Sequence, residues 1–303
     1  MFQKAMLIYN GNAGQRDAEK ILSQTAPILA SKIPKLFLYQ TQKPGDAEHF
    51  CRQHGEEVEL VIVMGGDGTV HEAINGLAPL DKRPGLAILP AGTCNDFARS
   101  LNIPLNLKQA AELIVFNGVE CEVDLVETDD RYFSNFWGTG LIAAASESID
   151  DTSKGMFGRL SYYMSALRTL SEQDTFHFKL EFDGRTVEDD AVMLLFMNGK
   201  SIGAAEFPME SIQMDDGLLN VLVVKEAGFT LLKEIFTAKT SVDWEENEST
   251  ITQYMTSSCK VTLDETQTID LDGEHYKGAH DTIRILNKHI SVIVPSGATA
   301  ENG

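Results

Sequence analysis

The sequence predicts an α/β protein in which a parallel α/β domain is followed by an antiparallel β domain. Strand-like apolar runs alternate with helical patterns up to about residue 124, and three of these runs end in turns of small or polar residues. Beyond that point, short segments rich in β-branched and aromatic residues follow one another, separated by turns. We place the first domain at residues 1–125 with a return segment at about 289–303, and the second at 126–288.

The amino-terminal elements follow directly from these patterns. We expect strands at 4–9, 35–39, 58–64 and 86–89, and helices at 16–30, 45–54, 69–77 and 107–116. This alternation favours a parallel sheet covered by helices. In the second domain we expect strands at 131–136, 175–182, 191–197, 218–224, 260–263, 268–271 and 282–285. Turns such as Asp183-Gly184 separate these strands. Trp137 is most simply interpreted as a residue of the hydrophobic core.

The most informative turn is Gly65-Gly66-Asp67-Gly68-Thr69, between an apolar run and a helical pattern. Glycines let the backbone approach a ligand closely, and the following helix offers unpaired N–H groups at its positive dipole end. That geometry suits phosphate, although a plain strand-to-helix connection is the commoner meaning of such a turn.

Two other strand ends carry similar turns. One apolar run leads into Pro90–Arg99, with the sequence PAGTCNDFAR, and another leads into Asn10–Gly14, with the sequence NGNAG. Ligands of open α/β sheets bind beyond the carboxyl ends of the strands, so three such turns predict one composite site.

These motifs resemble a known family. GGDGT at Gly65–Thr69, GTxNDFAR at Gly92–Arg99 and LDGE at Leu271–Glu274 look like the signatures of soluble bacterial diacylglycerol kinases, which are related to sphingosine kinases and NAD kinases. The motifs match in order and spacing along nearly the whole chain. The resemblance implies a Rossmann-like amino-terminal domain, a carboxy-terminal antiparallel β-sandwich and a final return strand at 289–294.

The implied activity is transfer of the γ-phosphoryl group of ATP to diacylglycerol, giving phosphatidic acid. Alternatives are a kinase of another lipid or of NAD, or a nucleotide-binding regulatory protein without turnover. Two departures from the family motivate the last idea: Gly11, where proline is usual, and the irregular segment 199–208.

The resemblance assigns ATP binding to residues of the three turns and of the helix after GGDGT. They are Asn10, Gly11, Asn12, Ala13, Gly14, Thr41, Gly66, Asp67, Gly68, Thr69, Val70, His71, Glu72 and Thr93. Backbone N–H groups and hydroxyls can reach phosphate oxygens, which supports the glycines and Thr93 best. Thr41 is equally well explained as a cap or turn residue.

The acidic residues divide into catalytic and metal-binding candidates. By resemblance, Asp67 and Asp96 act in catalysis with the Mg²⁺ of the nucleotide, and Asp124 joins them as a metal ligand at the end of a neighbouring strand. Glu274 is implied as the general base that takes the proton of the acceptor hydroxyl. Its neighbour His275 is a rival base, and the Asp272-Gly273 pair also fits a purely structural hairpin turn.

A second Mg²⁺ site is implied around the sequence Gln213–Leu218. The resemblance supplies the Asp216 carboxylate together with Gln213 and Leu218, a small set of oxygen ligands that suits a hard cation. The alternative is a plain Asp-Asp-Gly turn between strands.

Composition limits the partners. The formal charge is −20, which argues against nucleic acid, and no apolar run approaches the ~20 residues of a membrane span. The start does not resemble a signal peptide, so we expect a cytoplasmic protein that reaches its lipid peripherally at the inner face of the membrane. Segment 153–168, with three cations among apolar residues and no acid, is the candidate docking face, or else an ordinary amphipathic core helix.

Two further questions concern cysteines and assembly. The four cysteines are scattered without CxxC spacing, which indicates neither a zinc site nor a disulfide framework. A homodimer is compatible with the sequence.

Overall fold

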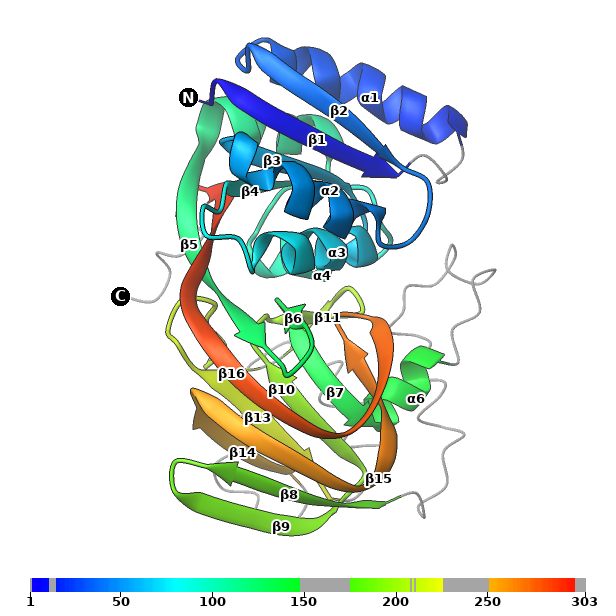
Figure 1. Cartoon of the computed structure of the whole chain (residues 1–303), viewed down its shortest axis with the longest axis vertical. Coiled ribbons are helices and arrows are strands. Elements are labelled where there is room, and N and C mark those ends of the chain that lie inside the picture. The colour runs from blue at the N-terminus through cyan, green and yellow to red at the C-terminus, as the bar shows by residue number, and fades with distance from the viewer. Residues whose placement is uncertain are drawn as a thin grey trace. The chain divides into compact units, whose positions relative to one another are not determined.

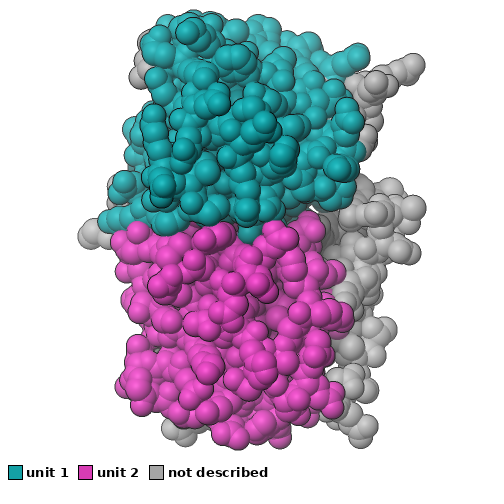
Figure 2. Space-filling model, in the orientation of Figure 1, with its two compact units in different colours: residues 1–123, 288–303 teal, residues 124–287 magenta. Residues whose placement is uncertain are grey.

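The computed structural model describes residues 2–10, 15–147, 175–207, 209, 211–225 and 251–297. The chain divides into two compact units, shown in different colours in Figure 2. The first comprises residues 1–123 and 288–303, and the second comprises residues 124–287. The predicted docking segment 153–168 and the predicted ligands Gly11–Gly14 lie outside the described residues.

The first unit alternates strands and helices, as the sequence predicted. Its elements are β1 (Lys4–Asn10), α1 (Gln15–Ala30), β2 (Lys35–Thr41), α2 (Asp46–His54), η1 (Gly55–Glu57), β3 (Leu60–Gly65), α3 (Asp67–Leu77), β4 (Gly85–Pro90), α4 (Asp96–Ser100), α5 (Leu107–Glu112) and η2 (Leu113–Asn117). The predicted helix at 107–116 is therefore an α-helix that continues as a π-helix. The strand that follows, β5 (Gly118–Glu127), was not predicted and carries residues of both units.

The strands of the first unit form a parallel sheet. β1 lies between β2 and β3, and β3 pairs with β4 from Leu60↔Gly85 to Gly65↔Pro90 (Figure 1). The return strand belongs to β16 (Glu274–Pro295), whose Val292 pairs in parallel with Leu86 of β4. Because the strands are parallel neighbours, β1, β3 and β4 end at the same edge of the sheet.

Helices cover both faces of this sheet. On one face, odd-numbered residues of β1 such as Leu7 form a core cluster with Leu29 of α1 and Ala110 of α5. On the other, α2 packs against α3, and Phe50 of α2 lies 5.2 Å from Tyr39 of β2, measured between ring centroids. Strands buried on both faces read as continuous apolar runs, which explains why their sequences do not alternate.

The second unit is built from antiparallel strands and one described helix. Its further elements are β6 (Tyr132–Phe133), β7 (Phe136–Gly140), α6 (Leu141–Glu147), β8 (Phe176–Phe182), β9 (Arg185–Ala191), β10 (Met193–Met197), β11 (Ser201–Ile202), β12 (Ala205–Glu206), β13 (Leu219–Val224), β14 (Ile251–Thr256) and β15 (Ser258–Leu271). The pairing order is β14-β13-β10-β7-β15-β16, and the β8–β9 hairpin joins β15 through β8. All these pairs are antiparallel, which confirms the predicted class.

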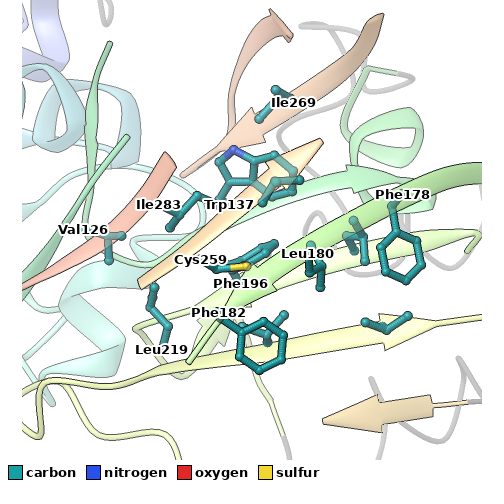
Figure 3. Packing of buried hydrophobic residues seen from close by; sticks show 14 of the residues in the cluster. Val126, Trp137, Phe178, Leu180, Phe182, Phe196, Leu219, Cys259, Ile269 and Ile283 are labelled. Atoms are coloured by element: carbon teal, nitrogen blue, oxygen red, sulfur yellow. The ribbon is translucent and has the colours of Figure 1, made fainter. Parts of the chain in front are cut away.

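The largest core cluster of the second unit is rich in aromatic residues. Phe178, Leu180 and Phe182 of β8 contribute at every second position, as expected for a strand with one buried face (Figure 3). Trp137 is fully buried and meets Phe196 edge-on at 5.2 Å between ring centroids. The prediction that Trp137 is a core residue is confirmed.

Two Asp-Gly pairs each make a tight hairpin in the second unit. Asp183-Gly184 joins β8 to β9 and Asp272-Gly273 joins β15 to β16, with φ of 49° and 70° in the first and 53° and 93° in the second. Positive φ at both positions is the signature of the type I′ turn, which Asp-Gly favours. Among the described residues, no helix has both the length and the apolar content that crossing a bilayer requires.

Candidate functional site

The loops after β3 and β4 lie against each other at the carboxyl edge of the parallel sheet. The Ala91 N–H donates to the Gly65 carbonyl at 2.9 Å, which extends the strand pairing into the loops. A Cβ added to Gly92 would lie 2.4 Å from the Gly66 Cα, so the two loop backbones are in direct contact. Only glycine permits this approach, which accounts for one glycine of each motif.

Asp67 joins the two loops through its carboxylate. One oxygen accepts the Asn95 N–H at 2.8 Å and the other accepts the Asp96 N–H at 2.6 Å. Hydrogen bonds to an ionised acceptor are shorter and stronger than neutral ones. The sequence predicts Asp67 as a catalytic carboxylate that acts with the Mg²⁺ of the nucleotide, and this stays a prediction; the structure shows that its carboxylate positions the second loop.

The Asn95 side chain closes the second loop with two hydrogen bonds to the backbone of Gly92. Its side-chain oxygen accepts the Gly92 N–H and its amide nitrogen donates to the Gly92 carbonyl, both at 2.9 Å. Its φ of 54° lies in the left-handed region, which asparagine tolerates better than most residues. The sequence analysis included Asn95 in the GTxNDFAR motif but did not predict these hydrogen bonds.

The predicted phosphate-binding residues differ in their accessibility. Gly66, Gly68 and Thr69 are half-buried at the start of α3, and Thr93 is exposed. Asn10 is half-buried at the end of β1, the strand next to β3. These residues therefore lie at one edge of the sheet, where Thr93 is exposed and the others are half-buried.

Other predicted ATP residues point into the protein. His71 is 3% exposed, and its Nε2 lies 3.3 Å from Asn75 Nδ2; Val70 is buried too. Glu72 accepts the Ala47 N–H at 3.1 Å and so links α3 to α2. Thr41 is buried and donates its hydroxyl to the Tyr9 carbonyl at 3.4 Å, a contact that fits the structural alternative.

Three side chains of metal-binding type meet beside these loops. One ligand atom each of Asp67, Cys94 and Asp96 lies within 4.8 Å of the other two. Cys94 and Asp96 are buried, whereas Asp67 is half-buried. The two carboxylates fit Mg²⁺, which prefers oxygen ligands, while the thiol does not.

The predicted second metal site lies in the other unit and contains Asp124. Asp124 is fully buried inside β5, so the expectation that it stands at a strand end was wrong. Its N–H donates to the Met214 carbonyl at 2.6 Å, and one of its carboxylate oxygens accepts the Gly217 N–H at 2.7 Å. The structure therefore brings Asp124 to the Gln213–Leu218 loop, where the other predicted ligands are found.

The electrostatics of this loop suit a cation. The pKa of Asp216 is raised by burial and by the neighbouring negative charges of Asp124 and Asp215. One Asp216 oxygen accepts the Leu218 N–H at 2.9 Å, which fixes the carboxylate in the turn. A divalent cation near these acids would offset their mutual repulsion.

The β15–β16 hairpin carries the predicted base. Glu274 is exposed at the first position of β16, directly after the Asp272-Gly273 turn. His275 Nε2 lies 3.9 Å from an oxygen of Asp270, a fully buried residue whose other oxygen accepts the Gly273 N–H at 2.6 Å. The turn is thus a true hairpin turn, and it presents Glu274 and His275 on its outgoing strand.

Sequence analysis missed the residue that anchors this hairpin. Asp272 is 9% exposed and accepts four hydrogen bonds, from the N–H groups of Ser134, Asn135 and Phe136 and from the Ser134 hydroxyl, at 2.8–3.0 Å. In the sequence Asp272 stands out only through the LDGE motif and the Asp-Gly pair, which predict a turn but no partner so distant in the chain.

Asn198 was missed for the same reason. It is fully buried, and its side-chain nitrogen donates to the Asp124 and Ser134 carbonyls at 3.1 and 2.8 Å. Its backbone N–H donates to the Asn135 carbonyl at 2.9 Å. These bonds hold the strand carrying Asp124 beside the segment that Asp272 anchors.

Comparisons with known proteins agree along both units. The family described as "Diacylglycerol kinase catalytic domain" matches residues 4–128, and the "YegS C-terminal NAD kinase beta sandwich-like domain" matches residues 137–294. The "Putative lipid kinase SAR0780" of Staphylococcus aureus (strain MRSA252) is 32% identical over 278 residues, covering 90% of this chain and 91% of its own.

Solved structures give the same result. The chain is similar to a crystal structure described as a "putative diacylglycerol kinase" from Bacillus anthracis str. Sterne, with a TM-score of 0.87, 38% identity and 97% of both chains covered. An NAD kinase from Archaeoglobus fulgidus in complex with ATP has a TM-score of 0.51 at 12% identity, covering 98% of this chain and 96% of its own, which shows a shared fold alone.

Proposed function

We propose a function on the premise that this chain belongs to the lipid kinase family that carries the diacylglycerol kinase catalytic domain. The protein transfers the γ-phosphoryl group of ATP to the hydroxyl group of diacylglycerol, giving phosphatidic acid and ADP. The observation that supports this most is the pair of glycine loops at the ends of β3 and β4, joined by the Asp67 carboxylate. Their backbone amides and the Thr93 hydroxyl supply donors for a polyphosphate.

Phosphoryl transfer depends on positioning and charge stabilisation more than on covalent chemistry by the protein. The Asp67 and Asn95 hydrogen bonds hold the two loops in one conformation before the nucleotide arrives, so less ordering is needed on binding. Asp67 and Asp96 supply carboxylate oxygens for the Mg²⁺ that accompanies ATP, and bound Mg²⁺ neutralises phosphate charge.

Glu274 is the general base of this proposal. Its carboxylate takes the proton from the acceptor hydroxyl, whose oxygen forms a bond to the γ-phosphorus while the bond from that phosphorus to the β–γ bridging oxygen breaks. The products are a phosphomonoester and ADP. His275 is the rival base, because Asp270 lies 3.9 Å from its Nε2 and would stabilise its protonated form.

The second unit supplies the acceptor side in this proposal. Asp124, Gln213, Asp216 and Leu218 would hold a further Mg²⁺ that stabilises the loop packed on β5. The lipid is reached peripherally at a membrane surface in this proposal.

Product analysis with radiolabelled ATP tests the activity. Purified protein is offered diacylglycerol, sphingosine, phosphatidylglycerol and NAD in separate reactions, and we expect labelled phosphatidic acid from the first. Product from another acceptor alone would replace diacylglycerol in the proposal. No product from any acceptor, together with normal ATP binding, would favour a nucleotide-binding regulatory protein.

Variants of the hairpin test the base. Glu274→Gln keeps the size of the side chain and removes its basicity, so we expect kcat to fall by about 10²–10⁴-fold with ATP affinity retained. His275→Gln serves as the matched control on the adjacent residue and should keep most of the activity. If His275→Gln lost much more activity than Glu274→Gln, His275 would be the general base instead.

A further inference from the structure

The cluster of Asp67, Cys94 and Asp96 contains a ligand type that Mg²⁺-dependent phosphoryl transfer does not use. All three ligand atoms lie within 4.8 Å of one another, so the three residues could hold one metal ion. Mg²⁺ selects oxygen ligands, whereas a thiolate selects softer cations such as Zn²⁺. The scattered spacing of the cysteines gave no hint of such a site, because its ligands come from two different loops.

The surroundings of the cluster favour binding of a cation. Cys94 is 1% exposed and Asp96 is 6% exposed, so a carboxylate and a thiol are held together in a poorly hydrated place. A bound cation would neutralise negative charge in such a place.

The backbone that carries the ligands is also held in place. The Arg99 guanidinium donates from Nε to the Cys94 carbonyl at 2.7 Å, and Asn95 clasps Gly92 from the next position. Side chains on a fixed backbone lose less freedom when they close around an ion.

We propose that Asp67, Cys94 and Asp96 form a binding site for a thiophilic divalent cation of the Zn²⁺ class, and that this cation excludes the nucleotide from the loops. On binding, the Cys94 thiol releases its proton to solvent and the sulfur bonds to the metal. Two carboxylate oxygens and a water complete four-coordination. Exclusion of ATP rests on the proposed function, whereas cation binding does not.

Cobalt titration tests the site without any substrate. A cysteine thiolate bound to Co²⁺ gives a near-ultraviolet charge-transfer band that oxygen ligands do not give. We expect this band in the wild type at one Co²⁺ per chain, its loss on adding Zn²⁺, and its absence in Cys94→Ser. Cys121→Ser is the matched control, because Cys121 lies on β5 outside the cluster, and it should keep the band.

The site would be overturned if the wild type showed no band with excess Co²⁺, or if the band persisted in Cys94→Ser. Circular dichroism of Cys94→Ser checks that its fold is retained. Asp96→Asn provides a second variant that keeps the thiol, and its Co²⁺ affinity should fall by about 10–100-fold. Unchanged affinity in Asp96→Asn would also contradict the three-ligand arrangement.

Nucleotide displacement tests the exclusion. A fluorescent ATP analogue bound with Mg²⁺ should be displaced by Zn²⁺ from the wild type at a concentration at least about tenfold lower than from Cys94→Ser. Equal Zn²⁺ sensitivity of the two proteins would refute exclusion. A cobalt band in a protein that phosphorylates no lipid would refute the proposed function and leave the cation site standing.

Discussion

Replacement of Asp272 by asparagine should destabilise the second unit far more than the same replacement in a hairpin turn of matching geometry. The Asp272 carboxylate is 9% exposed and accepts three backbone N–H groups and one hydroxyl from residues 134–136. Asparagine keeps one oxygen and turns an N–H₂ group toward donors, so at least one buried N–H loses its acceptor. Asp183→Asn is the control, because Asp183 occupies the equivalent turn position at φ 49° and is exposed.

The magnitude follows from the hydrogen bonds. A buried donor left without a partner costs about 1–3 kcal/mol, and the remaining bonds lose the strength that an ionised acceptor gives. We expect Asp272→Asn to lower the free energy of unfolding by about 2–4 kcal/mol, and Asp183→Asn to change it by less than about 0.5 kcal/mol.

Urea denaturation followed by tryptophan fluorescence measures this difference, since Trp137 lies in the core of the second unit. With a slope of about 2 kcal/mol per molar urea, the midpoint of Asp272→Asn should fall by about 1–2 M. Equal midpoints for Asp272→Asn and wild type at the same slope would refute the reasoning, because the four hydrogen bonds would then contribute no net stability.

Three further predictions concern other parts of the molecule. Gly92→Ala should weaken ATP binding by about tenfold or more, since its Cβ would lie 2.4 Å from the Gly66 Cα. Gly85→Ala, at the start of the strand that leads into the Gly92 loop, is the control, because its Cβ would lie 3.4 Å from a flexible Leu60 methyl. Equal ATP affinities of the two variants in calorimetry would contradict this. We expect Mg²⁺ to raise the melting temperature of the wild type by binding at the Gln213–Leu218 loop, and Asp216→Ala to abolish that rise. An unchanged rise in a thermal-shift assay of Asp216→Ala would remove Asp216 from the metal site. Burial raises the pKa of Asp281 in the folded state, so its contribution to stability is fully present below the ordinary carboxyl pKa and is lost as the pH rises through the raised value. Asp281→Asn should therefore show a smaller gain in unfolding free energy than wild type when the pH is lowered from 7 toward 4, and parallel pH profiles would count against this.

Local sequence patterns predicted much of the fold. Runs such as Leu60–Met64 are apolar at every position because both faces of the strand are covered. The helix predicted at 69–77 is present, but it begins at Asp67, within the glycine turn. Asp183-Gly184 and Asp272-Gly273 predicted hairpins because few other pairs tolerate positive φ at both positions. The π-helical turn at Leu113–Asn117 and the long strand β5 were missed, because packing rather than local preference decides them.

The candidate site was predictable in its composition and less so in its contacts. The order of GGDGT and GTCND along the chain, together with parallel strands, is enough to bring Gly66 and Gly92 to one edge of the sheet. It does not reveal that Asp67 bonds the backbone of Asn95, or that His71 and Thr41 turn inward. Burial and hydrogen-bond partners depend on which segments pack together, and sequence spacing does not encode that directly.

The class of the protein, its turn chemistry and the residues from which a phosphate site could be built are readable from the amino-acid sequence, because these depend on periodicity and on backbone preferences of nearby residues. Three contacts required the folded chain: Asp272 with residues 134–136, Asp124 with the Gln213–Leu218 loop, and Asp67 with Cys94 and Asp96. Each of these contacts joins residues brought together by packing of separate elements, and the free energy that selects them belongs to the folded unit rather than to any one segment.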